Sequence, residues 1–357
     1  EEGRISVISH ALNDVISDEP IHVFARFKPS RELEVHEVVL RVPPLPVRAL
    51  GLGPLLGANQ TRGKFEGRLR YRELEGQPRV DLSGRAQGIE LLEWTARLPG
   101  GPLHGRIDLT IDQADLTERG LVGAKLRGGA EGLQLAEWMR LIGLTPLEGS
   151  VDLEVLHAEF ADNRLVRMAV RGKAVAQTAE PLTALIGPGQ IAGTLRATVN
   201  SLVVSGERVV SGDVDVEVIP PKDAPATLDT ELIVGASRSL LGTELPPLVA
   251  VPLQRLKTVT YSRLAFKLVA DEDQLRILGT HGPGGRSILT VRLFGTDLAV
   301  VSQPERPIEL TPLVARLRGA GEKKVRELFE RYQISPATRP AAAEHSDPSS
   351  TTRSLPG

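Results

Sequence analysis

The feature of this sequence that most constrains its fold is a motif that recurs about every 44 residues. Two stretches, 88–105 and 132–149, share seven of 18 positions, and weaker copies occupy 45–57 and 182–193. A chain with a fixed period of this size folds as an array of similar units, each of which contacts its neighbours along the chain. The fold is therefore expected to be long and repetitive.

Each copy of the motif is followed by a run in which apolar and polar residues alternate. After Gly149, for example, apolar residues occupy every second position from Val151 to Val155. A second alternating run follows each first one, and its apolar positions include Val122 and Val166. Strict alternation with a period of two is typical of a β-strand that has one buried face and one solvated face.

These patterns predict a mainly β protein. Helical arrays are excluded because most of each unit alternates with period two, and a propeller blade needs about four strands where each unit supplies about two. We expect an elongated, curved antiparallel sheet, a taco-like β-groove, built from strand–strand–short-helix repeats of about 44 residues. Trp94 and Trp138 recur within the short helices, where we interpret them as packing that seats each helix on the sheet.

The repeat and its end divide the chain into five parts. We expect N-terminal strands and a first short helix at 1–60, the repeat β-groove at 61–234, and a C-terminal β-module at 235–310. An apolar stripe with helical spacing predicts an amphipathic helix at 311–334. The final residues, 335–357, are rich in proline, serine, threonine and alanine and are predicted to be disordered.

Composition narrows the function. The 357 residues include no cysteine, which excludes zinc fingers, iron–sulfur clusters and thiol catalysis. A formal charge of −2 and only 7 Phe, 3 Tyr and 2 Trp argue against a nucleic-acid partner, which needs a basic surface and usually stacking side chains. No nucleophile elbow, phosphate loop or metal-ligand spacing of histidines is present, so we expect neither an enzyme nor a cofactor.

Two sets of like-charged residues alternate along single strands and are candidate sites. We name them the acidic ladder and the basic ladder. Asp213, Asp215 and Glu217 alternate along one strand, which spreads them over roughly 13 Å. Three ligands of one calcium ion must lie within about 2.5 Å of it, so we interpret the ladder as a solvated outer face. The basic ladder of Arg68 and Arg70, continued by Arg72, is interpreted in the same way, with anionic headgroups as the alternative partner.

The remaining candidate site is the apolar face of the sheet. Short helices cannot cover a sheet of this length, so either two halves of the sheet close a dry core or a gap remains as an aliphatic trough. Large exposed apolar surface on a soluble protein usually binds a partner, and an acyl chain suits a trough of this shape. The candidate lipid-groove residues are Leu69, Ile107, Leu109, Ile111, Val151, Leu153, Val155, Leu195 and Val199.

One unit carries a resemblance to a known family. Residues from Leu135 to Val155 resemble the repeats of AsmA-like bacterial envelope proteins, the TamB/AsmA type, in which a short Leu-Leu-x-x-Leu-Gly helix precedes a Leu-x-Gly-x-Leu-x-Leu strand. The stretch from Val251 to Leu278 is similar to that family's C-terminal module, and the resemblance covers roughly residues 35–310. It implies a β-groove protein of the double-membrane envelope, usually held in the inner membrane by one N-terminal helix.

Two functions follow as expectations. The first is a periplasmic AsmA-like protein that binds or conducts phospholipid acyl chains between membranes, or that supports outer-membrane assembly. The second is a structural or secretion-apparatus component that binds envelope proteins through its sheet edges. Because the chain begins with Glu1 and not with Met, we expect an inner-membrane anchor or a signal segment upstream.

Overall fold

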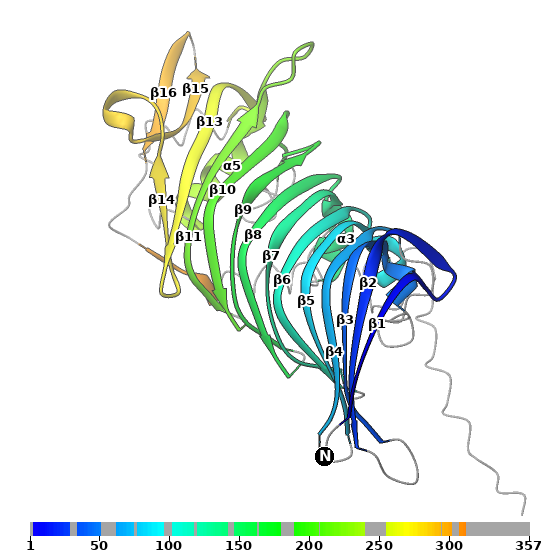
Figure 1. Cartoon of the computed structure of the whole chain (residues 1–357). Coiled ribbons are helices and arrows are strands. Elements are labelled where there is room, and N and C mark those ends of the chain that lie inside the picture. Colours follow the sequence, from blue (N-terminus) through cyan, green and yellow to red (C-terminus); the bar gives the residue numbers. More distant parts are fainter. Residues whose placement is uncertain are drawn as a thin grey trace, which may run out of the picture.

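A computed structural model describes most of the chain. The described residues are 3–28, 34–50, 62–74, 77–95, 102–117, 120–141, 146–162, 164–179, 189–206, 208–239, 255–293, 295–301 and 307–311. They form a mainly β structure with a single open antiparallel sheet of 17 strands (Figure 1), as predicted. The predicted disordered tail at 335–357 and all but the first residue of the predicted helix at 311–334 lie outside the described residues.

The strands are long and the helices are short. The strands are β1 (Gly3–Leu12), β2 (Val15–Lys28), β3 (Glu34–Pro46), β4 (Lys64–Leu74), β5 (Gln77–Glu90), β6 (Arg106–Thr117), β7 (Gly120–Gln134), β8 (Gly149–Ala161), β9 (Arg164–Ala176), β10 (Thr194–Ser205), β11 (Arg208–Ile219), β12 (Thr227–Asp229), β13 (Thr258–Asp271), β14 (Gln274–Gly279), β15 (Ser287–Leu293), β16 (Thr296–Val301) and β17 (Ile308–Glu309). The helical segments are η1 (Val47–Leu50), α2 (Leu91–Thr95), α3 (Leu135–Leu141), α5 (Thr230–Ser239) and η2 (Pro283–Gly285).

The sheet is a meander. Each strand from β1 to β10 pairs with the next one along the chain, and β11 then pairs with β13. Near its start β13 pairs with β12 and β15, and near its end it pairs with β14. In Figure 1 the strands from β1 to β13 lie side by side in this order and bend in the same direction along their length. Among the described strands, β1 pairs only with β2 and so forms one edge of the sheet.

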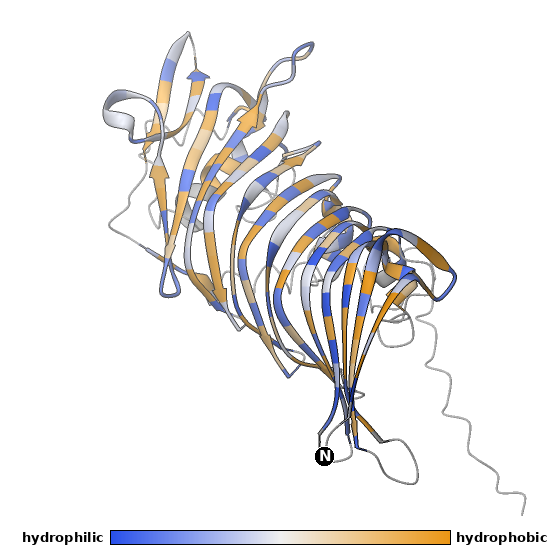
Figure 2. Ribbon diagram, in the orientation of Figure 1, coloured by the Kyte–Doolittle hydropathy of each residue, from blue (hydrophilic) through white to orange (hydrophobic). Residues whose placement is uncertain are grey.

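The two faces of the sheet differ in polarity, as the alternation along the strands in Figure 2 shows. The face that carries Leu69, Leu109 and Leu153 is here named the apolar face, and the opposite one the polar face. Antiparallel pairing keeps alternate residues of every strand on the same face, so the two characters persist from strand to strand.

One-residue bulges interrupt the alternation at regular places. Asp112 in β6 is an extra residue relative to both neighbouring strands, and so are Leu156 in β8 and Asn200 in β10. These three positions are 44 residues apart. A bulge adds one residue to one strand, bends that strand and increases its local twist.

A second set of bulges corrects part of the prediction. Val122 and Val166 were expected on the apolar face, but each is an extra residue in its strand and is exposed, by 37% and 42% respectively. Their carbonyl oxygens accept hydrogen bonds from the N–H groups of Asp162 and Gly206, both at 2.9 Å. The expectation was wrong because a bulge shifts the alternation by one residue, and a period-two pattern does not reveal that shift.

Glycines lie opposite the first set of bulges. Gly84, Gly128 and Gly172 are again 44 residues apart, and a Cβ on each would stand 2.0–2.2 Å from a carbonyl oxygen of the preceding strand. Only glycine permits backbones to approach this closely. These glycines and the bulges beside them form a line across β5 to β10, here named the crease, at which the strands bend.

Candidate functional site

All nine predicted lipid-groove residues lie in β4, β6, β8 and β10, and the sheet register brings them onto the apolar face. Ile107, Leu153 and Val199 share one row of cross-strand neighbours, which runs from β5 to β14. That row consists of Ile89, Ile107, Ala130, Leu153, Gly172, Val199, Val214, Leu268 and Ile277.

A neighbouring row is longer still and contains Leu109 and Val155. It crosses twelve strands without a polar residue: Leu45, Phe65, Ala86, Leu109, Gly128, Val155, Val170, Leu202, Gly212, Ala270, Leu275 and Ile308. The apolar face is therefore continuous across nearly the whole sheet.

Burial is not uniform along this face. One buried cluster includes Leu69 and lies on β2 to β6, where Ile107, Leu109 and Ile111 pack against it. Another lies on β11, β13, β15 and α5, and Leu195 packs against it.

Between the two clusters the burial of the apolar face is mixed. Val151, Leu153 and Val155 in β8 and Val199 in β10 belong to neither cluster, and each is only partly buried. Aliphatic side chains of β8 and β10 thus remain in partial contact with solvent, whereas Val170 and Ala176 of the intervening strand β9 are buried. We name these four residues the open band.

Only some of the predicted short helices lie within the described residues. α2 and α3 begin 44 residues apart, at Leu91 and Leu135, within the two best copies of the motif. Trp138 in α3 is half-buried, whereas the side chain of Trp94 and most of the copy at 182–193 lie outside the described residues. α5 was not predicted, because its sequence does not repeat the motif of the other helices. It supplies Leu232 and Ile233 to the second cluster.

Ion pairs link neighbouring strands on the polar face. On β4 to β6, Arg72 Nη2 lies 2.5 Å from Asp81 Oδ2, and Arg79 Nη2 lies 2.9 Å from Asp115 Oδ2. Burial, together with a hydrogen bond to Asp115, raises the pKa of Asp81 above its ordinary value of 3.8. Charges of both signs alternate here, so this part of the polar face is balanced.

Two of the three residues in the acidic ladder on β11, Asp213 and Asp215, have side-chain partners. The amide of Asn200, at the bulge in β10, donates to Asp213 Oδ1 at 2.8 Å and to Asp215 Oδ2 at 2.7 Å. Lys267 Nζ of β13 lies 3.0 Å from Asp213 Oδ1. In the described part of the chain no group of three or more His, Asp or Glu side chains has the geometry to hold a metal ion.

These contacts give a pH-dependent prediction. The hydrogen bond from Asn200 and that from Lys267 lower the pKa of Asp213 below its ordinary 3.8. A carboxyl group whose pKa is lower in the folded state stabilises the fold at pH values above its pKa in the unfolded state. This contribution is lost as the pH falls through its pKa in the folded state. We expect Asn200→Ala to raise the pKa of Asp213 and to destabilise the fold more at pH 7 than at pH 2.

Carboxyl-carbon NMR titration measures that pKa, and thermal denaturation at both pH values measures the stability. Ser201→Ala, at the next position in β10, serves as the control and should leave the titration of Asp213 unchanged. An unaltered Asp213 titration in the Asn200→Ala protein would contradict the prediction.

The comparisons with protein-family models, with curated proteins and with solved structures each returned no match to this chain. Within the described residues, no helix combines the length and the apolar character needed to cross a membrane.

One group of residues escaped the sequence-based reasoning. Arg68 and Arg70 were recognised as part of a ladder along one strand, but Arg4, Arg26 and Arg41 stand alone in the sequence. The register of β1 to β4 places all five on the polar face of four adjacent strands. The pairing of β1 to β4 brings the five together, and no pattern within a single strand shows this.

Proposed function

We propose that this chain is an AsmA-like β-groove protein of the bacterial cell envelope, built from strand–strand–short-helix units of 44 residues, which holds phospholipid acyl chains along its apolar face. The observation that carries the proposal is the uninterrupted apolar row across twelve strands. The partial exposure of Val155 in this row, and of Leu153 and Val199 in the neighbouring row, supports an apolar ligand over a fully closed core.

The length of the face favours conduction over a single site. The row from β5 to β14 includes nine strands, and eight spacings of about 4.8 Å give roughly 38 Å. The hydrocarbon core of a bilayer is about 30 Å thick, so one acyl chain covers about 15 Å. The face is thus long enough for more than two chains end to end. Each CH₂ group that leaves water for this face contributes about 0.8 kcal/mol.

Site-specific photo-crosslinking in cells tests the proposal. A photoreactive residue at position 109, 153 or 199 is expected to capture phospholipid, because Leu109, Leu153 and Val199 lie on the apolar face. The same residue at 108 or 152, where Asp108 and Asp152 point to the polar face, is the matched control. Capture at the control positions without capture at the apolar ones would refute the groove.

A specific feature favours a second function, the binding of a protein partner at the sheet edge. Edge strand β1 exposes Ile5, Val7 and Ile8 by 47%, 47% and 62%. An unpaired edge with exposed apolar side chains can accept a strand from another chain. Native mass spectrometry of protein purified without detergent separates the two functions: bound phospholipid supports the first, and a stoichiometric protein partner without lipid supports the second.

A further inference from the structure

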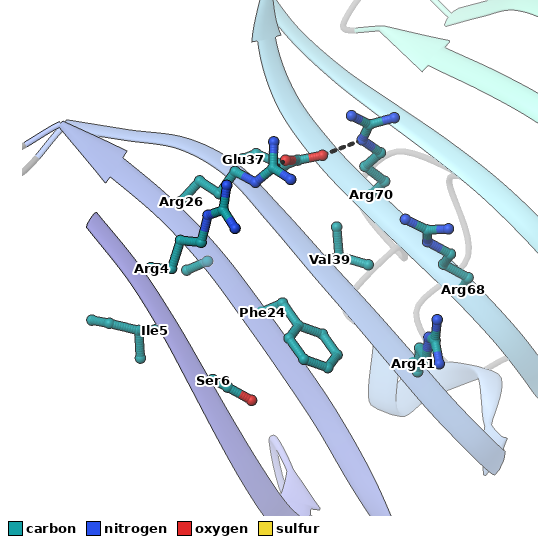
Figure 3. Close-up of a pocket in the computed structure, with 11 residues that line it drawn as sticks. Arg4, Ile5, Ser6, Phe24, Arg26, Glu37, Val39, Arg41, Arg68 and Arg70 are labelled. Atoms are coloured by element: carbon teal, nitrogen blue, oxygen red, sulfur yellow. Dashed lines mark hydrogen bonds and ion pairs between the residues drawn. The ribbon is translucent and has the colours of Figure 1, made fainter. Parts of the chain in front are cut away.

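The five arginines on β1 to β4 line a cleft of about 560 Å³ on the polar face. Figure 3 shows Arg4, Arg26, Arg41, Arg68 and Arg70 projecting from four adjacent strands around Phe24 and Val39. The cleft lies beside the sheet edge formed by β1 and on the face opposite the proposed lipid groove. We name these five residues the arginine cluster.

Arginines face one another directly in this cleft. Arg4 is the cross-strand partner of Arg26, and Arg41 is the partner of Arg68. Like charges in directly opposite positions destabilise a pair of strands. The arrangement therefore works against the stability of the free sheet.

Among the residues that line the cleft, a single carboxylate compensates the cluster, and Asp81 lies opposite Arg70 on the side toward β5. Glu37 pairs with Arg70, and its Oε2 lies 3.4 Å from the Nε of Arg26. Within the described part of the chain, Arg4, Arg41 and Arg68 form no ion pair. Five positive charges against one negative charge leave a formal charge of +4 in the cleft, whereas the neighbouring polar face on β5 and β6 pairs its arginines with aspartates.

We propose that the arginine cluster is a binding site for a phosphate ester. A guanidinium donates two parallel hydrogen bonds to phosphate oxygens and is weakly hydrated, which makes arginine the usual residue for such groups. Arg41 on β3 and Arg68 on β4 are direct cross-strand neighbours, so two guanidinium groups that form no ion pair within the described residues lie side by side for one phosphate, while Arg4 lines the β1 side of the cleft. The volume exceeds that of one phosphate, and the exposed ring of Phe24 offers apolar contact to the part of the ligand that the phosphate esterifies.

The site is independent of the lipid groove, since it lies on the other face of the sheet and shares only β4 with the groove residues. The phosphate has two sources, a phospholipid headgroup and a soluble phosphate ester. Isothermal titration with two phosphate monoesters distinguishes them: dihexanoyl phosphatidic acid below its micelle concentration, and glycerol phosphate, which has no acyl chains. We expect saturable binding that weakens as the salt concentration rises. Tighter binding of the lipid identifies the headgroup as the source, and equal binding identifies the soluble ester.

The variant Arg41→Gln/Arg68→Gln removes two unpaired charges from the cluster. We expect it to weaken binding of the tighter probe at least about tenfold while the melting temperature stays the same or rises, because a like-charge pair is removed. The matched control, Arg196→Gln/Arg276→Gln, removes two exposed arginines from β10 and β14 and should bind as the parent protein does.

Two results would overturn the site. One is the absence of saturable binding of either probe to the parent protein. The other is an equal loss of binding in the two double variants, which would mean that net charge alone attracts the anion. Neither result bears on lipid capture at Leu153 or Val199, so this site and the proposed groove fail separately.

Discussion

Replacing Gly128 with alanine is expected to destabilise the fold by about 3 kcal/mol. The new Cβ would stand 2.0 Å from the carbonyl oxygen of Asp108 in β6 and 2.9 Å from the Cα of Leu109. Both are backbone atoms, so relief requires that β6 and β7 separate at the crease, where their hydrogen bonds are lost. Overpacking alone costs about 1–3 kcal/mol, and the positive φ of 157° adds strain for any residue with a side chain.

Urea denaturation followed by circular dichroism measures this effect. The control lies in the same strand: a Cβ on Gly123 would meet only the carbonyl oxygen of Phe160, at 3.7 Å. Gly123→Ala should therefore change the free energy of unfolding by less than about 0.5 kcal/mol. Equal stabilities of the two variants would show that the close approach at the crease does not exist. Gly172→Ala, with its Cβ 2.2 Å from the carbonyl oxygen of Asp152, is expected to behave as Gly128→Ala does.

Replacing Val199 with glutamate is expected to reduce the phospholipid that co-purifies with the protein about tenfold. Val199 belongs to the open band and to neither buried cluster, so the change leaves the core intact. A carboxylate beside an acyl chain loses its hydration and gains no hydrogen bond or ion pair in return. This desolvation costs several kcal/mol if the group stays charged. A tenfold loss corresponds to about 1.4 kcal/mol and is a conservative expectation.

Thr198→Glu is the matched control, because Thr198 precedes Val199 in β10 and points to the polar face. It adds the same charge at almost the same position and should leave the bound lipid unchanged. Lipid per mole of protein, measured by mass spectrometry after detergent-free purification, reports both variants. If the two variants lose lipid to the same extent, or if neither loses any, acyl chains do not lie on the apolar face.

Much of the sheet could be predicted because alternation is a local property. The apolar positions of β6, β8 and β10 up to Ile111, Val155 and Val199 alternate strictly, and all of them lie on one face. The bulges that follow were not predicted, because Asp112, Leu156 and Asn200 have no residue type in common. What they share is a glycine opposite each of them in the preceding strand. The spacing of these glycines, 44 residues apart, is visible in the sequence and could have indicated the bulges.

The two candidate sites differ in how much of each could be predicted from the sequence. The apolar face follows from patterns within single strands, and the register places its nine predicted residues on the same face of β4 to β10. Whether the face is open depended on packing between distant elements, such as α5 against β13, which no strand pattern contains. The arginine cluster depended on register, since a shift of one residue between β3 and β4 would carry Arg68 away from Arg41.

The regular spacing of the crease has a consequence for how such a chain changes in length. Removing residues 106–149 would set β5 beside β8 with Gly84 opposite Val155, which repeats the contact that Gly128 makes now. The junctions from β5 to β11 repeat with a shift of 44, so a deletion or a duplication of 44 residues within them keeps the register of the strands. Two strands are added or lost each time, about 9.6 Å. The length of the sheet is therefore adjustable in evolution by whole steps of about 10 Å.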